Sequence, residues 1–306
     1  MTAPRFRSAL LVRGAVLDLA RPALMGVVNA NPDSFSDPGQ RPLAAQLDQV
    51  GRMVDDGATI IDVGGQSGIT GVPEVDPLVE RERVVPLVEA IAAEHPRITI
   101  SVDSYKPWVV EGSLAAGAGI VNDVSGLLYP EIAELAARRG AALVVMHTRA
   151  RPKERLADPA AYPDIVADVR DFLAEKVAIA IDRGIDERSI VVDPGPDFSK
   201  TPHQTIEVLR HLDVVDPDGL PMLLAISRKD FIGAVTETGP TERLAGTLAA
   251  VGAVGSGTGV ILRVHDVAEV RRFLAVHAVL EGATEVDPGL VLPDRLRWKD
   301  GVRPSA

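Results

Sequence analysis

Residues 59–71 read TIIDVGGQSGITG, an apolar run that holds one acid and ends at two glycines. A short run of this kind is typical of a parallel strand that is buried on both faces and is followed by a polar, glycine-rich loop. The same order of apolar run, polar loop and helical spacing recurs along the chain. This stretch therefore defines the repeating unit of the fold.

Eight apolar runs predict strands at residues 23–28, 59–63, 97–102, 119–121, 142–146, 189–192, 222–226 and 259–262. The segments that follow them predict helices at residues 43–56, 77–94, 106–116, 130–139, 165–183, 203–212, 243–255 and 267–280. Asp76 is a plausible cap for the second helix, with Pro77 at its first position. Eight strand–helix units predict an α/β protein of the (β/α)8 or TIM-barrel class.

This pattern divides the chain into three parts. Residues 1–22 form an N-terminal extension that contains a short hairpin, residues 23–282 form the barrel domain, and residues 283–306 form an irregular, proline-rich tail. A doubly wound open sheet is the alternative fold. It normally has fewer strands, and neither a G-x-G-x-x-G loop nor a P-loop follows the first run here.

The composition favours an enzyme that acts on small molecules. With 306 residues, 46% apolar content and a mean hydropathy of +0.13, the chain can bury a large core. The net charge of −11 disfavours a nucleic-acid surface. The absence of cysteine excludes disulfides, thiolate nucleophiles and cysteine-type zinc sites. No apolar run has the ~18 residues that a membrane span needs, so we expect a cytoplasmic protein without a membrane partner.

The catalytic residues of such a barrel lie at the carboxyl ends of its strands. The candidates are therefore Asn29, Asp62, Asp103, Asn122, Met146 with His147, Asp193, Ser227 with Lys229, and Arg263 with His265. Carboxylates, an amide and an ammonium group can together bracket a flat heterocycle that has several donors and acceptors. Arg263 and His265 lie two residues apart on the last strand and could hold an anionic group.

Ordinary structural roles stay open for some of these residues. Asp62 and Asp123 at strand ends could be caps of turns or helices. His147 could be a buried structural histidine, and the basic segment 149–155 could be a solvated loop or a lid over an anionic substrate. The coincidence of polar residues after nearly all eight runs favours a functional site.

Eight segments are similar to those of a known family: MGVVNANPDSFSD (25–37), IIDVGG (60–65), SVDS (101–104), NDVSG (122–126), VMH (145–147), DPGPDFSK (193–200), SRK (227–229) and RVHDV (263–267). The sequence resembles dihydropteroate synthase, a pterin-binding barrel, over residues 24–281. The resemblance implies a transferase of folate biosynthesis. In its reaction the amine of p-aminobenzoate displaces pyrophosphate from 7,8-dihydropterin-6-ylmethyl diphosphate.

The resemblance also implies roles for single residues. The pterin ring would be held by Asp103, Asn122, Met146, Asp193 and Lys229. The catalytic set would be Asn29, Lys229, Arg263 and His265, of which Asn29, Arg263 and His265 hold the diphosphate and Asn29 is the ligand of a Mg²⁺ cofactor. The aminobenzoate side would be Phe35, Phe198, Lys200 and Ser227. A homodimer is implied as well.

The loop at residues 66–71 departs from the family pattern. The family usually reads Glu-Ser-Thr-Arg-Pro-Gly there, whereas this chain has Gly68 and Ile69 in the place of the threonine and arginine. An apolar side chain cannot replace a guanidinium against an anion, a loss on the order of 2 to 4 kcal/mol of transition-state binding. A pterin-binding paralogue with weak or no synthase activity, as in a divergent actinobacterial group, is therefore the alternative function.

Two further classes of protein are alternatives to a synthase and its paralogue. A corrinoid-linked methyltransferase has a related barrel, but the segments SRK and DFSK disfavour it. A purely structural or regulatory barrel would bind no saturable ligand at its strand ends.

Overall fold

The computed structural model of the protein describes residues 6–30, 43–66, 71, 73–154, 156–216 and 218–297. Its strands are β1 (Ala9–Val12), β2 (Ala15–Asp18), β3 (Ala23–Asn29), β4 (Ile60–Gly64), β5 (Thr99–Asp103), β6 (Ile120–Asp123), β7 (Ala142–Met146), β8 (Ile190–Asp193), β9 (Met222–Leu224) and β10 (Val260–Val264). The first two form an antiparallel hairpin, and the other eight form a closed parallel barrel in the order β10-β3-β4-β5-β6-β7-β8-β9. The predicted barrel class and the N-terminal hairpin are confirmed.

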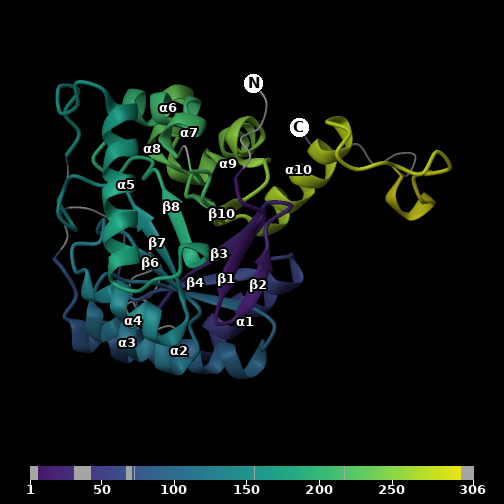
Figure 1. Ribbon diagram of the computed structural model, residues 1–306. Coiled ribbons are helices and arrows are strands. Elements are labelled where there is room, and N and C mark those ends of the chain that lie inside the picture. The colour runs from purple at the N-terminus through teal and green to yellow at the C-terminus, as the bar shows by residue number, and fades with distance from the viewer. Residues whose placement is uncertain are drawn as a thin grey trace.

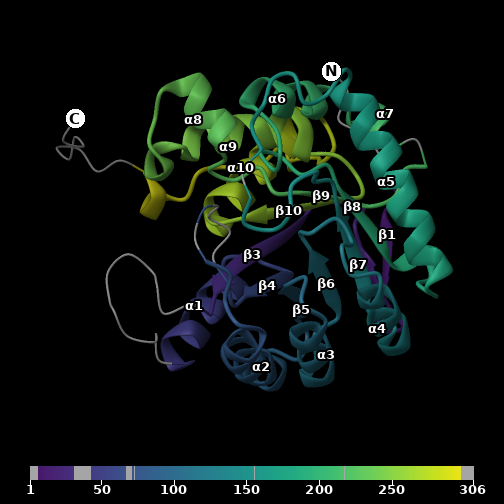
Figure 2. The ribbon, with the colours of Figure 1, turned by 90° about the vertical axis from the view of Figure 1, so that its left-hand side faces the viewer.

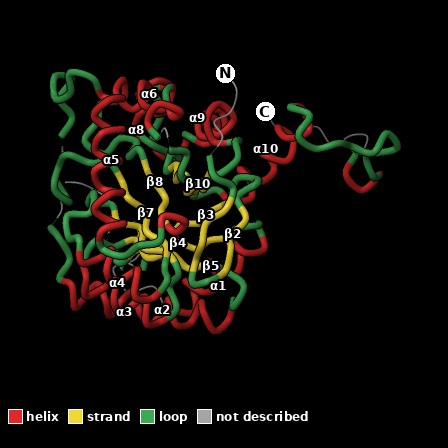
Figure 3. Tube along the Cα trace, in the orientation of Figure 1, coloured by secondary structure: helices red, strands yellow, loops and turns green. Residues whose placement is uncertain are grey.

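The helices of the described residues surround this barrel, as Figures 1 and 3 show. They are α1 (Leu43–Asp55), α2 (Pro77–Glu94), α3 (Pro107–Ala116), α4 (Glu131–Arg139), α5 (Ile165–Asp182), α6 (Pro202–Arg210), α7 (Leu212–Val215), α8 (Asp230–Thr236), α9 (Leu244–Ala250) and α10 (Val267–Leu280). Figure 2, turned by 90°, shows α1, α2 and α3 on one side of the strands and α6 and α8 on the other. The predicted cap of α2 is present, because the Asp76 carboxylate accepts the Leu78 N–H at 2.8 Å.

The helical region after β9 differs from the prediction. The sequence predicts one helix over 243–255, but α9 ends at Ala250 and continues as a single π turn, Val251–Gly255. Gly252 and Gly255 allow this wider turn to approach Phe273 and Leu262, since a Cβ at either glycine would lie within 2.8 Å of those side chains. The short helix α8 was not predicted, because seven residues are too few to show a helical period.

The N-terminal hairpin covers the barrel interior at the amino ends of the strands. Leu10 and Leu19 are fully buried and pack in one cluster with inward-facing strand residues such as Ile60, Ile120 and Ile261. The alternate strand residues face outward and pack against the helices in a second, larger cluster. Each strand is therefore covered on both faces, which is why the runs are continuously apolar rather than alternating.

The chain after α10 extends away from the barrel (Figure 1). No helix in the described ranges is long and apolar enough to cross a membrane. The boundaries of the three predicted parts, 1–22, 23–282 and 283–306, stay a prediction.

Candidate active site

Three candidate residues, Asn29, Asp103 and Asn122, lie in one row at the carboxyl ends of β3, β5 and β6. In the strand register, Asn29 is the partner of Gly64, Gly64 of Asp103, and Asp103 of Asn122. Met146 is likewise the partner of Asp193 on the next pair of strands along the barrel. The chain thus brings an amide, a carboxylate and a second amide to one row of the barrel mouth.

The guanidinium of Arg263 reaches across this mouth from β10. Its Nε lies 2.7 Å from Asp62 Oδ2, and its Nη2 lies 2.7 Å from Asp103 Oδ2. The Asn122 side-chain amide donates to the same Asp62 oxygen at 3.2 Å. Asp62 is therefore no cap but the fully buried centre of a charged network, a role that a lone strand-end acid does not reveal in the sequence.

Two buried acceptors in this network have no hydrogen-bond partner among the described residues. They are Asp62 Oδ1 and Asn122 Oδ1, both inside the barrel mouth. A buried oxygen without a donor is costly, typically about 1 to 3 kcal/mol. Such oxygens suit a ligand that brings N–H groups into the mouth.

The carboxylate of Asp103 is subject to opposing influences. Burial raises the pKa of this carboxyl to about 7, while the Arg263 guanidinium works in the other direction. For Arg263 itself, burial disfavours the charge, but Asp62 and Asp103 more than offset it and raise the pKa of the guanidinium. Arg263 is therefore a permanent cation at the centre of the site.

Asp193 and Lys229 form a second pair of charges in the site. Burial raises the pKa of the Asp193 carboxyl to about 6, against the Gly195 N–H that donates to it at 2.7 Å and the nearby Lys229. Burial lowers the pKa of the Lys229 ammonium, which lies 4.4 Å from the centroid of the Phe198 ring. Met146, the register partner of Asp193, is fully buried.

His265 and Ser227 occupy the rim beyond β9 and β10. The Ser227 hydroxyl lies 3.0 Å from His265 Nδ1 and also accepts the His265 backbone N–H at 3.3 Å. Partial burial of the ring, together with Arg263 and Arg228, lowers the pKa of His265. Asn29 is exposed at the end of β3.

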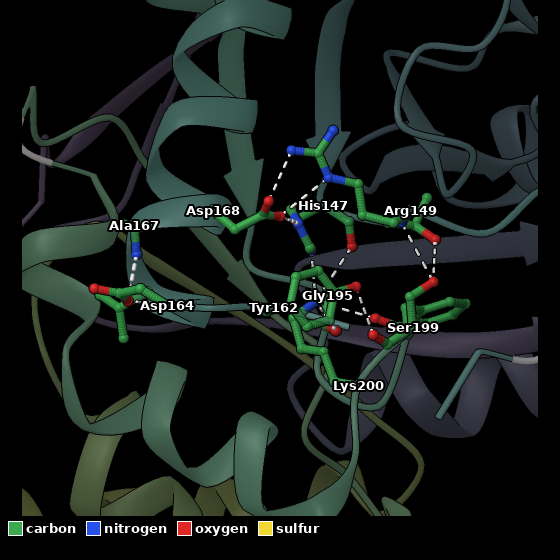
Figure 4. Close-up of polar contacts among 12 residues, drawn as sticks. His147, Arg149, Tyr162, Asp164, Ala167, Asp168, Gly195, Ser199 and Lys200 are labelled. Carbon is green, nitrogen blue, oxygen red and sulfur yellow. Dashed lines mark hydrogen bonds and ion pairs between the residues drawn. The ribbon is translucent and has the colours of Figure 1, made fainter. Parts of the chain in front are cut away.

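Lys200 and His147 lie inside the fold, next to each other. Lys200 Nζ is 2.7 Å from His147 Nδ1, and His147 Nε2 is 2.9 Å from Asp168 Oδ1 (Figure 4). The sequence left a structural role for His147 open, and it gave no signal for Asp168, which is an ordinary helical acid. Asp123 is a turn cap, as the sequence allowed, because it accepts from the Ser125 and Leu127 amides.

The structure describes residues 65, 66, 71 and 73–76 of the loop between β4 and α2. The Gln66 side chain accepts the Val75 N–H at 2.7 Å and donates to the Tyr105 hydroxyl at 3.1 Å. Gly71 donates its N–H to the Lys153 carbonyl at 3.0 Å, so the loop contacts the basic segment that follows β7 at this residue. The predicted aminobenzoate residue Phe35 and the substituted positions Gly68 and Ile69 lie outside the described residues.

The fold and the side chains at the mouth of the barrel together define a class of protein. A closed parallel barrel that gathers carboxylates, amides, an ammonium and a guanidinium at the carboxyl ends of its strands is an enzyme barrel with a site for a small polar ligand.

Comparisons with known proteins narrow the class. A family model described as pterin binding enzyme matches residues 25–265. Dihydropteroate synthase of Escherichia coli (strain K12) is 39% identical over 273 residues, which cover 89% of this chain and 96% of the relative. The Bacillus subtilis (strain 168) dihydropteroate synthase is 41% identical over 252 residues, covering 81% and 85%.

Solved structures agree with these relatives. Xanthomonas albilineans dihydropteroate synthase with 4-aminobenzoic acid has a TM-score of 0.81 at 36% identity, covering 90% of this chain and 98% of that one. Burkholderia cenocepacia dihydropteroate synthase complexed with 7,8-dihydropteroate has a TM-score of 0.81 at 33% identity, covering 92% and 99%. The chain belongs to the dihydropteroate synthase family. It is a transferase of the dihydropteroate synthase kind, which acts in folate biosynthesis.

The charge pair of Asp193 and Lys229 gives a testable titration. Carbon-13 NMR of the aspartate carboxyls should find that Asp193 titrates near pH 6. Removing the cation in a Lys229→Met variant should raise that pKa further, because the ionised carboxylate loses a favourable neighbour. Lys176→Met, on α5, is the matched control and should leave the titration unchanged. An Asp193 that titrates near its ordinary value in all three proteins would contradict this description.

Proposed function

We propose that this chain condenses 7,8-dihydropterin-6-ylmethyl diphosphate with p-aminobenzoate and releases pyrophosphate. The observation that supports it is the convergence of charges at one end of the barrel, where the buried Asp193 carboxylate is influenced by Lys229, Lys200 and Arg263. A cationic half of the site suits a diphosphate, and an acceptor-rich half suits a pterin. The family resemblance points to the same pair of substrates.

Asp193, Asn122, Asp103, Met146 and Lys229 would bind the pterin ring. A carboxylate such as Asp193 can accept two N–H groups from the aminopyrimidinone edge at once. Asn122 Oδ1, which has no partner among the described residues, can accept another. The buried Met146 side chain offers an apolar face for the ring.

Arg263, His265 and Asn29 would bind the diphosphate. Arg263 contacts Asp62 and Asp103 through Nε and Nη2, and about a fifth of its side chain (21%) is exposed, so the guanidinium can also face a ligand. As pyrophosphate leaves, negative charge grows on its oxygens, and fixed cations stabilise that charge. The amine nucleophile needs no general base, so positioning and leaving-group stabilisation would supply most of the rate.

Mg²⁺ fits this arrangement through Asn29. The described residues contain no cluster of three histidine, cysteine or carboxylate side chains that could hold a metal alone. Mg²⁺ commonly takes few protein ligands and completes its shell with water and substrate phosphates, and the exposed Asn29 amide oxygen suits that role. When bound, the ion would neutralise diphosphate charge.

Phe35, Phe198, Lys200 and Ser227 are the residues proposed from the sequence for the aminobenzoate side. A cytoplasmic location and a homodimer are also part of the proposal. The exposed apolar side chains of α10, Val276 at 61% and Leu280 at 80% exposure, support association through that helix.

Calorimetric titration with the dihydropterin diphosphate and Mg²⁺ tests the proposal, followed by p-aminobenzoate and a pyrophosphate assay. We expect saturable binding and then release of pyrophosphate that depends on the amine. Asp193→Asn should lower kcat/KM by about 10- to 100-fold, because hydrogen bonds to the charged acceptor are lost. The pterin affinity should fall as the pH falls through about 6, where the Asp193 carboxylate becomes protonated. An absence of binding by the unaltered chain would reject the proposed substrates.

A weakly active, pterin-binding paralogue is the second candidate, and the observation that favours it is Gly68 and Ile69 in the loop after β4. Gly68→Thr with Ile69→Arg should then raise turnover by about 30-fold or more, because the new arginine supplies a guanidinium that can bind the substrate anion. Gly68→Ser with Ile69→Leu is the control and should leave turnover unchanged. Equal rates in the restored and unaltered proteins would show that this loop is not what limits activity.

A further inference from the structure

The segment after β8, residues 194–200, adopts a backbone that needs support. Asp197 and Ser199 have φ values of +64° and +54°, in the left-handed region that side chains with a Cβ disfavour. Gly195 has a φ of +63°, and a Cβ there would collide with the backbone oxygen of His147. Neighbouring groups must therefore hold this segment, which we call the β8 loop, in place.

Lys200 holds the β8 loop through hydrogen bonds from its side-chain amine to the loop backbone. Its ammonium lies 2.7 Å from His147 Nδ1, 2.9 Å from the Gly195 carbonyl and 3.0 Å from the Phe198 carbonyl. Burial lowers the pKa of Lys200 to about 7, while the Asp193 carboxylate acts in the other direction. In its protonated form the amine has three hydrogens to donate, and these three acceptors suit them. The residue is only 3% exposed. Its amine is thus committed to contacts with His147 and with the loop backbone.

His147 and Asp168 extend this contact to the surface (Figure 4). Burial lowers the pKa of His147 to about 4, so its ring is neutral and can accept from Lys200 at Nδ1 while it donates to Asp168 at Nε2. The Asp168 carboxylate also accepts two hydrogen bonds from Arg149, at 3.0 and 2.9 Å. One chain of polar contacts therefore runs from an arginine of the β7–α5 connection to the backbone of the β8 loop.

Ser199 fixes the same loop from a second side. Its hydroxyl lies 3.0 Å from Thr148 Oγ1 and accepts the Ala150 N–H at 2.9 Å. Its carbonyl accepts from the Tyr162 hydroxyl at 2.6 Å. The β7–α5 connection and the β8 loop are thus joined as one unit.

The fixed loop acts directly on the proposed pterin site. Its Gly195 N–H donates to the Asp193 carboxylate at 2.7 Å, and its Phe198 ring lies 4.4 Å from the Lys229 ammonium. The loop atoms that contact Asp193 and Lys229 belong to the two residues whose carbonyls Lys200 holds. A shift of this backbone would move both groups.

We propose that Lys200 is a positioning residue which, with His147 and Asp168, locks the β8 loop so that Asp193 and Lys229 face the pterin. This positioning role replaces the aminobenzoate contact that the family resemblance implies for Lys200, and it rests on the proposed function. A contact residue for aminobenzoate would alter the KM of that substrate. A positioning residue of the loop alters the pterin affinity instead.

Lys200→Met and Lys176→Met are the matched pair for the test, since Lys176 is a half-buried lysine of α5 that contacts Phe172 rather than the loop. We expect Lys200→Met to weaken binding of the dihydropterin diphosphate by about 10- to 100-fold, because small misplacements of binding groups have effects of this size. The KM for p-aminobenzoate should stay within about threefold of its original value, and Lys176→Met should behave as the unaltered protein. Unchanged pterin binding in Lys200→Met, or a raised KM for p-aminobenzoate alone, would overturn the proposal.

Two measurements keep the proposal testable if Lys200→Met does not fold. In the unaltered protein, nitrogen-15 NMR at pH 6, below the pKa of Lys200 and above that of His147, should find His147 protonated at Nε2 and not at Nδ1. Protonation at Nδ1 would overturn the contact with an ammonium. Asp168→Asn should speed hydrogen exchange of the Phe198 amide and weaken pterin binding less than Lys200→Met does, whereas unchanged exchange would argue against the chain of contacts. If the unaltered protein binds no pterin, the proposed function fails, while the histidine and exchange data still decide whether Lys200 holds the loop.

Discussion

The mouth of this barrel depends on one guanidinium. Arg263 comes from the last strand, and its partners Asp62 and Asp103 come from β4 and β5, which are not its neighbours in the barrel. Because Asp62 is fully buried, its carboxylate needs a compensating cation, and removing one partner of such a pair typically costs about 3 to 5 kcal/mol. The same contact brings positive charge to the place where we propose that a diphosphate binds. Arg263 therefore both compensates a buried carboxylate in the fold and supplies positive charge to the proposed diphosphate site.

The rest of the site is built in two ways. Asn29, Asp103, Asn122 and Asp193 lie at strand ends, where the barrel register fixes their backbone. Phe198, by contrast, lies in a loop with left-handed residues, which the contacts of Lys200 hold in place. The residues at strand ends form a rigid half of the site. The position of the other half depends on the contacts that hold the loop. Substitutions far from the ligand would act through that second half.

The fold could be predicted from the sequence because every barrel strand is buried on both faces, so each one is a continuous apolar run. The row of candidate residues followed from the same fact, since parallel strands bring their carboxyl ends together. The roles assigned to single residues stay predictions. The partnership of His147 with Asp168 could not be predicted, because it joins a strand end to a helix residue 21 positions later without any local pattern. Likewise, Asp62 looked like any strand-end acid until Arg263 was seen beside it, 201 positions along the chain.

A double-mutant cycle between Arg263 and Asp62 tests the central claim most directly. The free energies of unfolding of Arg263→Met, Asp62→Asn and the double variant would be compared with that of the unaltered protein. If Arg263 compensates a buried carboxylate, Arg263→Met should lose about 3 kcal/mol or more, and the double variant should be more stable than Arg263→Met alone. Losses that simply add would contradict the account, because the two side chains would then be energetically independent.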